Sequence, residues 1–416
     1  MAVVGVTDEG KLILGQKTLS EHGKDLLKRT ETQVSQVRIV DFLLFAALIY
    51  GVPVPGLGLP FNQLIVFIIV GYALTRKSIF SLGRYSTFFV VLGIILAYIA
   101  IVSAVSDPSL YAADATRRFI RLVATTGLIY VIAVGRIHLR SAILGYCTAL
   151  FINAGLFFAG LAPDTYGGYL TGYLGDKNYA GLVHALFALL IMTVYSKRWQ
   201  QIVGLAVSCL LLWETGSRTS LAALLFAYLW ILIASRFHPM IKVLLLGIFY
   251  FLLNLVTEDY ADAKVFGDRS GSDALRARID EMSWTKVQET GFFGQGLGEA
   301  YVYDSSADRT WFFHNSYWSA FVEGGWVWAL VLVSLTLFVA VRPLSKKRRD
   351  EPLYRVLAQG VGVALLICAF RLGEVFYTLP WAICMGYVLR AAVTLLPAND
   401  KIELFGYDKQ IRSLNR

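Results

Sequence analysis

The stretch Ser86-Thr-Phe-Phe-Val-Val-Leu-Gly-Ile-Ile-Leu-Ala-Tyr-Ile-Ala-Ile-Val-Ser-Ala-Val105 contains no charged side chain. About 20 consecutive apolar residues are enough for a helix to cross the hydrocarbon core of a bilayer. The surrounding chain has a matching composition, because 56% of its 416 residues are hydrophobic and only 16% are charged. About a quarter of the residues are charged in soluble domains. The sequence therefore predicts a polytopic membrane protein.

Further apolar runs predict an all-α fold with about twelve transmembrane helices. The other runs lie near residues 39–51, 61–75, 119–135, 141–160, 179–195, 200–214, 219–235, 240–256, 316–341, 354–373 and 375–396. The predicted organisation is a tail (1–37), nine helices (38–256), one large loop (257–315), three helices (316–396) and a second tail (397–416). The polar first tail lacks the continuous apolar segment of a signal peptide.

The distribution of basic residues predicts the orientation in the membrane. Fifteen lie in the short even-numbered connections: Arg76, Lys77, Arg84, Arg136, Arg140, Lys197, Arg198, Arg236, Lys242, Arg342, Lys346, Lys347, Arg348, Arg349 and Arg355. The short odd-numbered connections hold only Arg117, Arg118, Arg121, Lys177, Arg218 and Arg371. Because Lys and Arg concentrate in cytoplasmic loops, we expect both tails in the cytoplasm and the 257–315 loop on the outer face.

The large loop has a pattern that predicts local structure. Leu275, Ile279 and Met282 recur on one face of an expected amphipathic helix, which we expect on the membrane surface. The following segment, Gly291-Phe-Phe-Gly-Gln-Gly-Leu-Gly298, contains glycines that permit positive φ and close backbone approach. Its two phenylalanines suit a dip into the membrane interface.

Arg218 stands at the start of a predicted helix on the outer side, against the charge rule. An ion pair with Glu214, four residues earlier, is the structural interpretation. A cation at a helix N-terminus faces the unfavourable end of the helix dipole. A bound anion explains Arg218 better, and we predict that this residue contacts one.

Three residues of the large loop are further candidates. Arg276 and Arg278 lie on the expected helix, where a solvated helix face is the alternative interpretation. Of the five histidines, His314 is the one expected in the outer loop, at the mouth of the tenth helix. A lone histidine is more often structural than catalytic, but the nearby arginines favour a functional role for His314.

At these residues the chain resembles the O-antigen ligase and polysaccharide polymerase superfamily, which uses undecaprenyl-diphosphate-linked glycans at the periplasmic face of the bacterial inner membrane. The matching motifs are Ser217-Arg218-Thr-Ser-Leu221, the loop arginine followed by Gly294-Gln-Gly296-Leu-Gly298, and His314-Asn-Ser-Tyr-Trp318 with Glu323-Gly324-Gly325 downstream. In the family an aromatic residue usually follows the loop arginine by four positions, whereas Asp280 follows Arg276 here. Arg276 and Arg278 therefore both remain candidates for that arginine.

The resemblance implies a membrane glycosyltransferase of the C-type architecture that needs no metal ion or other cofactor. Guanidinium groups such as those of Arg218 and Arg276 can stabilise the charge that develops on a leaving diphosphate. An imidazole can accept the proton of the attacking hydroxyl, and we assign this role to His314. Direct displacement predicts inversion at the anomeric carbon.

Other side chains are predicted to bind substrate. Lys177, in Asp176-Lys177-Asn178, resembles part of a Lys-Asn pair of exopolysaccharide polymerases, and a helix-capping turn is the alternative. Arg117, Arg118 and Arg121 would form a vestibule for the diphosphate or bind anionic lipid head groups. Glu323 is a candidate for a substrate contact or for a structural buried ion, and Arg371 with Glu374 is expected to form a structural buried ion pair.

Three functions are compatible with the sequence. A polymerase would join lipid-linked repeat units, and a ligase would transfer the finished glycan to an acceptor such as lipid A core. Both would use the same residues, and neither calls for nucleic acid as a partner. An anionic-solute transporter is less favoured, because the sequence has no matching pair of interrupted helices in its two halves.

Overall fold

The computed structural model describes residues 4–6, 12–14, 17–18, 37–56, 59–195, 197–234, 236–259, 270–306, 308–343 and 352–393. Most of the predicted first tail, all of the second tail, residues 260–269 of the large loop and the basic residues 346–349 lie outside this range. Near the N-terminus, three short strands form an antiparallel sheet: β1 (Val4–Val6), β2 (Leu12–Leu14) and β3 (Lys17–Thr18).

Each of the twelve apolar runs forms a helix, as predicted. The helices are α2 (Ile39–Ala47), α3 (Phe61–Leu74), α4 (Ser86–Val105), α5 (Ala115–Ala133), α6 (Leu139–Phe158), α7 (Lys177–Val194), α8 (Arg198–Glu214), α9 (Arg218–Ile233), α10 (Pro239–Asp259), α12 (Ser316–Leu335), α13 (Leu353–Arg371) and α14 (Leu379–Val393). A π-helix, η5 (Thr336–Val341), continues α12. The predicted loop helix is α11 (Ser270–Glu289).

The chain is an all-α membrane protein. Five of the described helical segments are long and apolar enough to cross a membrane: Gly83–Val105, Leu139–Phe158, Lys177–Val194, Ser316–Val341 and Leu353–Arg371. Shorter apolar segments include Phe61–Leu74, Arg218–Ile233, Pro239–Phe249 and Leu379–Val393. The helix α2 has only nine residues, and α5 has three arginines in its first two turns. Twelve crossings therefore remain a prediction.

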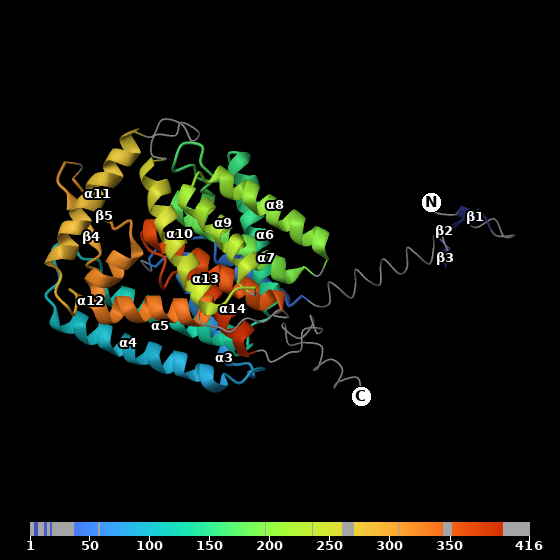
Figure 1. Ribbon diagram of the computed structural model, residues 1–416, viewed down its shortest axis with the longest axis horizontal. Coiled ribbons are helices and arrows are strands. Elements are labelled where there is room, and N and C mark those ends of the chain that lie inside the picture. The colour runs from blue at the N-terminus through green and yellow to red at the C-terminus, as the bar shows by residue number, and fades with distance from the viewer. Residues whose placement is uncertain are drawn as a thin grey trace.

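The helices pack around α13, which lies in the middle of the bundle (Figure 1). Its residues are nearly all buried, and small residues let neighbouring helices come close. A Cβ atom at Gly360 would lie 2.6 Å from Ile231 of α9. The other closely packed pairs include α2 with α6, α5 with α14, and α7 with α8.

The α11 helix and a β-hairpin form a small unit at one end of the bundle (Figure 1). The hairpin, which the sequence analysis did not predict, pairs β4 (Tyr301–Asp304) with β5 (Arg309–Phe312). Leu275, Ile279 and Met282 do share one face of α11. This face packs against the hairpin and α12, where it covers the buried Phe313 and Val322. The expected position of the helix on the membrane surface remains a prediction.

The helix α12 is broken at Gly324 and Gly325, and the glycine-rich segment docks onto the break. The backbone N–H groups of Gln295 and Gly296 donate to the carbonyl oxygens of Val322 and Glu323, at 2.7 and 2.9 Å. Gly294, Gly296 and Gly298 all have positive φ, which confirms the predicted role of these glycines. These hydrogen bonds fix the glycine-rich segment against the start of α12.

Candidate functional site

A cavity of about 870 Å³ lies between the helical bundle and the unit formed by α11 and the hairpin. Its walls come from α3, α5, α7, α11, β5 and the connection between α13 and α14. Four cationic side chains line it, Arg121, Lys177, Arg276 and Arg309, together with His314. The acidic side chains among the lining residues are those of Asp176 and Glu374. The described lining is therefore predominantly cationic.

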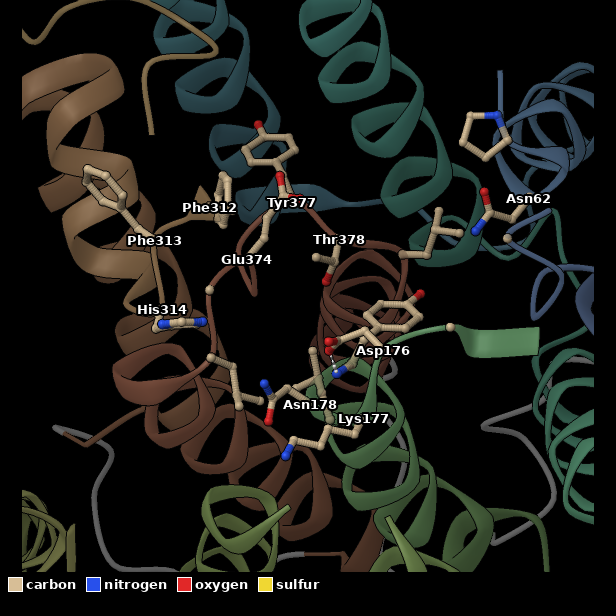
Figure 2. Close-up of a pocket in the computed structure, with 18 of the residues that line it drawn as sticks. Asn62, Asp176, Lys177, Asn178, Phe312, Phe313, His314, Glu374, Tyr377 and Thr378 are labelled. Carbon is tan, nitrogen blue, oxygen red and sulfur yellow. Dashed lines mark hydrogen bonds between the residues drawn. The ribbon is translucent and has the colours of Figure 1, made fainter. Parts of the chain in front are cut away.

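The backbone holds His314 firmly at the cavity wall (Figure 2). On one side, the fully buried Phe313 donates its N–H to the carbonyl oxygen of Ala300 at 3.2 Å. On the other side, Asn315 caps α12, and its side chain accepts from the N–H groups of Tyr317 and Trp318. The imidazole itself is 23% exposed and is thus accessible to a ligand.

The side chain of Asp280 on α11 lies between His314 and Arg371. Its carboxylate oxygens are 3.7 Å from His314 Nδ1 and 3.5 Å from Arg371 Nη1. The Nδ1 atom of His314 is buried and has no hydrogen-bond partner among the described residues. Asp280 is therefore a carboxylate close to the predicted base His314.

The two arginines of α11 have different surroundings. Arg276 lines the cavity. Arg278 is about half exposed, donates to Ser306 Oγ at 2.9 Å and lies 4.0 Å from the carboxylate of Asp304. Only Arg276 of this pair faces the cavity, because residues two apart on a helix point to different sides.

The three arginines at the start of α5 also differ. Arg117 is exposed and pairs with its neighbour Asp114 at 3.3 Å, away from the cavity lining. Arg118 is nearly buried, and its guanidinium binds Glu323 at 2.6 Å and Glu374 at 2.8 Å. Arg121 shares Glu374 and lines the cavity. Arg121 is therefore the member of this group that is best placed to meet a ligand.

Lys177 begins α7 at the cavity wall, after the N-cap Asp176 (Figure 2). The Asp176 carboxylate accepts from the N–H of Tyr179 at 2.8 Å, so the expected capping turn is present. The Lys177 ammonium lies over the rings of Tyr166 and Tyr169, 5.4 Å from each centroid. Lys177 thus stands at the cavity wall next to a capping turn.

Arg218 begins α9 and is not among the residues that line the cavity. Its neighbour Ser217 packs against α7, where a Cβ atom at Gly181 would lie 2.4 Å from Ser217 Cβ. The start of α9 therefore packs against α7 one turn after Lys177. The contact between Arg218 and an anion remains a prediction.

Several lining residues were not singled out from the sequence. One of them is Arg309 in the hairpin, whose Cζ atom lies 4.4 Å from the ring centroid of Trp311. Asn62 and Gln63 are at the start of α3, where two polar residues interrupt an otherwise apolar run. That interruption was the available signal for these amides.

The sequence matches no known family model and no curated protein. Within the described residues, no three His, Cys, Asp or Glu side chains are grouped in a way that could hold a metal ion.

Proposed function

We propose that this protein is a metal-independent inverting glycosyltransferase of the bacterial inner membrane. It transfers a glycan from an undecaprenyl-diphosphate carrier to an acceptor hydroxyl at the periplasmic face. The proposal includes twelve membrane crossings, a C-type architecture and cytoplasmic termini. It also places the α11 and hairpin unit, and hence the cavity, on the periplasmic side.

The observation that carries this proposal is the joint lining of one cavity by Arg121, Lys177, Arg276, Arg309 and His314. Arginine binds diphosphate oxygens through paired N–H donors, and lysine adds a point charge. An imidazole beside such cations can act as a base on a substrate whose phosphate groups they hold. Ligand cavities commonly have volumes of about 300 to 1,000 Å³, so 870 Å³ is large enough for a sugar diphosphate.

The proposed reaction is a single displacement. An acceptor oxygen attacks the anomeric carbon while the bond between that carbon and the diphosphate oxygen breaks. The acceptor proton passes to Nε2 of His314, and the electron pair of the broken bond remains on undecaprenyl diphosphate. Arg276 and Arg121 stabilise the charge that develops on the leaving group, and inversion follows from attack on the opposite face.

The proposed reaction is polymerisation of lipid-linked repeat units of an O-antigen or exopolysaccharide, with ligation to lipid A core as the alternative. A deletion strain separates the two reactions. Loss of a polymerase leaves single repeat units on the surface, and loss of a ligase leaves finished polymer on the carrier lipid. Unchanged surface glycan and unchanged carrier-linked glycan would contradict both, and a defect in uptake of an anionic solute would indicate a transporter.

The His314→Ala and His314→Gln variants test the mechanism in purified protein. A positioned base contributes roughly 10² to 10⁴ in rate, so we expect a loss of that size with unchanged binding of the lipid-linked donor. We also expect the acidic limb of the pH–rate profile to be absent in His314→Gln. The exposed His238 provides the matched control, His238→Gln. An identical acidic limb in wild type and His314→Gln would assign the base to another group.

A further inference from the structure

One part of the cavity lining carries neutral amide side chains. The start of α3 contributes two of them, Asn62 and Gln63. In Figure 2, Asn62 lies on the opposite side of the cavity from His314. The proposed function uses the cationic groups and His314, and it assigns nothing to these neutral side chains.

The two amides of α3 are held in place but make no side-chain hydrogen bond within the described part of the chain. The backbone N–H of Asn62 donates to the carbonyl oxygen of Tyr50 at 3.1 Å, and that of Gln63 donates to Pro60 at 3.0 Å. Their backbone is therefore fixed while their side chains remain available. Each amide offers both donors and an acceptor.

The chemistry of these groups fits sugar hydroxyls. A hydroxyl both donates and accepts a hydrogen bond, as an amide does. A polyprenyl tail has no hydrogen-bonding groups and would leave the amides unpaired. The volume of about 870 Å³ is close to the upper end for ligand pockets, so there is room beyond the diphosphate.

We propose that Asn62 and Gln63 form a subsite for uncharged sugar residues, across the cavity from His314. This inference rests on the proposed function, which places the diphosphate among the arginines. The sugars belong either to the donor glycan or to the acceptor glycan, since both present the same hydroxyl chemistry.

Binding to the purified full-length chain in detergent tests the subsite with two probes. One is the oligosaccharide that mild acid releases from the carrier lipid of the source bacterium, and the other is inorganic diphosphate. In the double variant with Asn62→Ala and Gln63→Ala, we expect the dissociation constant for the oligosaccharide to rise about tenfold, or about 1.4 kcal/mol. We expect the dissociation constant for diphosphate to change less than twofold. Arg276→Ala should instead raise the dissociation constant for diphosphate more than that for the oligosaccharide.

Matched variants control for folding and for the nature of the ligand. Gln201→Ala removes an amide outside the cavity that donates hydrogen bonds to the carbonyl oxygens of Met192 and Tyr195. This variant should not change oligosaccharide binding. Each variant is compared with wild type by size exclusion and melting temperature. Oligosaccharide binding that is absent in wild type or unchanged in the double variant overturns the subsite. Tighter binding of farnesyl phosphate by Asn62→Leu also overturns it, because a lipid would then occupy this region.

Transfer assays with wild type distinguish the subsite from the proposed function. If the protein transfers glycan but its oligosaccharide binding does not depend on Asn62 and Gln63, the subsite alone is overturned. If oligosaccharide binding depends on these amides but the protein transfers no glycan from the lipid diphosphate, the proposed function is contradicted and the sugar site is supported. Where both hold, a higher KM for the acceptor or for the lipid-linked donor in the double variant identifies which glycan occupies the subsite.

Discussion

The Nδ1 atom of His314 lies 3.7 Å from Oδ1 of Asp280, and the other oxygen of that carboxylate lies 3.5 Å from Arg371. A carboxylate facing Nδ1 favours the tautomer that carries its proton there, and Nε2 is then free to accept one. Hydrogen bonds of a catalytic site are often long without substrate and shorten when it binds. Asp280 is therefore proposed as a positioning residue for His314.

Replacing Asp280 by Asn should lower the transfer rate at least about tenfold, which corresponds to about 1.4 kcal/mol of transition-state stabilisation. The amide is isosteric but does not favour one imidazole tautomer as a carboxylate does. The measurement is kcat at saturating donor over a range of pH, where we also expect the acidic limb to shift. Asp107→Asn is the control, because Asp107 is exposed. A wild-type pH profile in Asp280→Asn would remove the positioning role.

Arg276 and Arg278 should differ in their effect on donor binding. A hydrogen bond to a charged group contributes about 1.5 to 3 kcal/mol, so Arg276→Ala should weaken diphosphate binding roughly 10- to 100-fold. Arg278→Ala should have little effect, since Arg278 is about half exposed and contacts the hairpin. Titration of each purified variant with inorganic diphosphate gives the comparison. Equal weakening by both substitutions would contradict the assignment of Arg276.

Glu299 should give the protein a pH-dependent part of its stability. Burial alone would raise its pKa, but bonds from Lys286 and Ser109 outweigh burial and hold the pKa below its ordinary value of 4.5. Its contribution is therefore present above pH 4.5 and is lost as the pH falls through the lowered folded-state pKa. Glu299→Gln should cost about 1.5 to 3 kcal/mol near neutral pH, and less under acidic conditions.

The melting temperature of Glu299→Gln in detergent, measured from pH 7 downward, checks this dependence. Glu289→Gln is the matched control, because Glu289, the last residue of α11, is exposed. A difference from wild type that stays constant with pH would show that the ionised carboxylate contributes no stability.

Gly325→Ala should destabilise the junction between α12 and the glycine-rich segment. The residue has a φ of 62°, and an added Cβ would lie 1.9 Å from the carbonyl oxygen of Phe292. Overpacking of this kind costs about 1 to 3 kcal/mol, and a lower melting temperature would reveal it. Gly291→Ala is the control, because nothing lies within 4 Å of a Cβ there. Equal melting temperatures for the two variants would contradict the close approach.

The orientation in the membrane can be tested by cysteine labelling. In a Cys209→Ser background, Ser305→Cys should react with an impermeant thiol reagent in right-side-out vesicles, and Ser345→Cys should not. The remaining native thiols, Cys147, Cys368 and Cys384, are buried and should stay unlabelled. The reverse pattern would place His314 on the cytoplasmic side and contradict the proposed function.

The sequence predicted the helices well because apolar runs bounded by polar residues identify each one. It missed the hairpin of β4 and β5, since two strands of four residues give little signal. It could not separate Arg276 from Arg278, because the side of α11 that faces the cavity depends on how Ile279 docks. Asn62 and Gln63 became candidates only when tertiary packing placed the start of α3 at the cavity wall.

The guanidinium of Arg118 joins three segments that are distant in sequence. It extends from α5 to Glu323 at the break in α12 and to Glu374 in the connection before α14. The Glu374 carboxylate at the cavity wall thus has arginine counter-ions before any substrate arrives. An electrostatic environment that is preorganised in this way needs little dipole reorientation during a reaction. Under the proposed function, turnover would then be limited more by the entry and exit of the bulky lipid-linked glycan than by rearrangement of the charged groups.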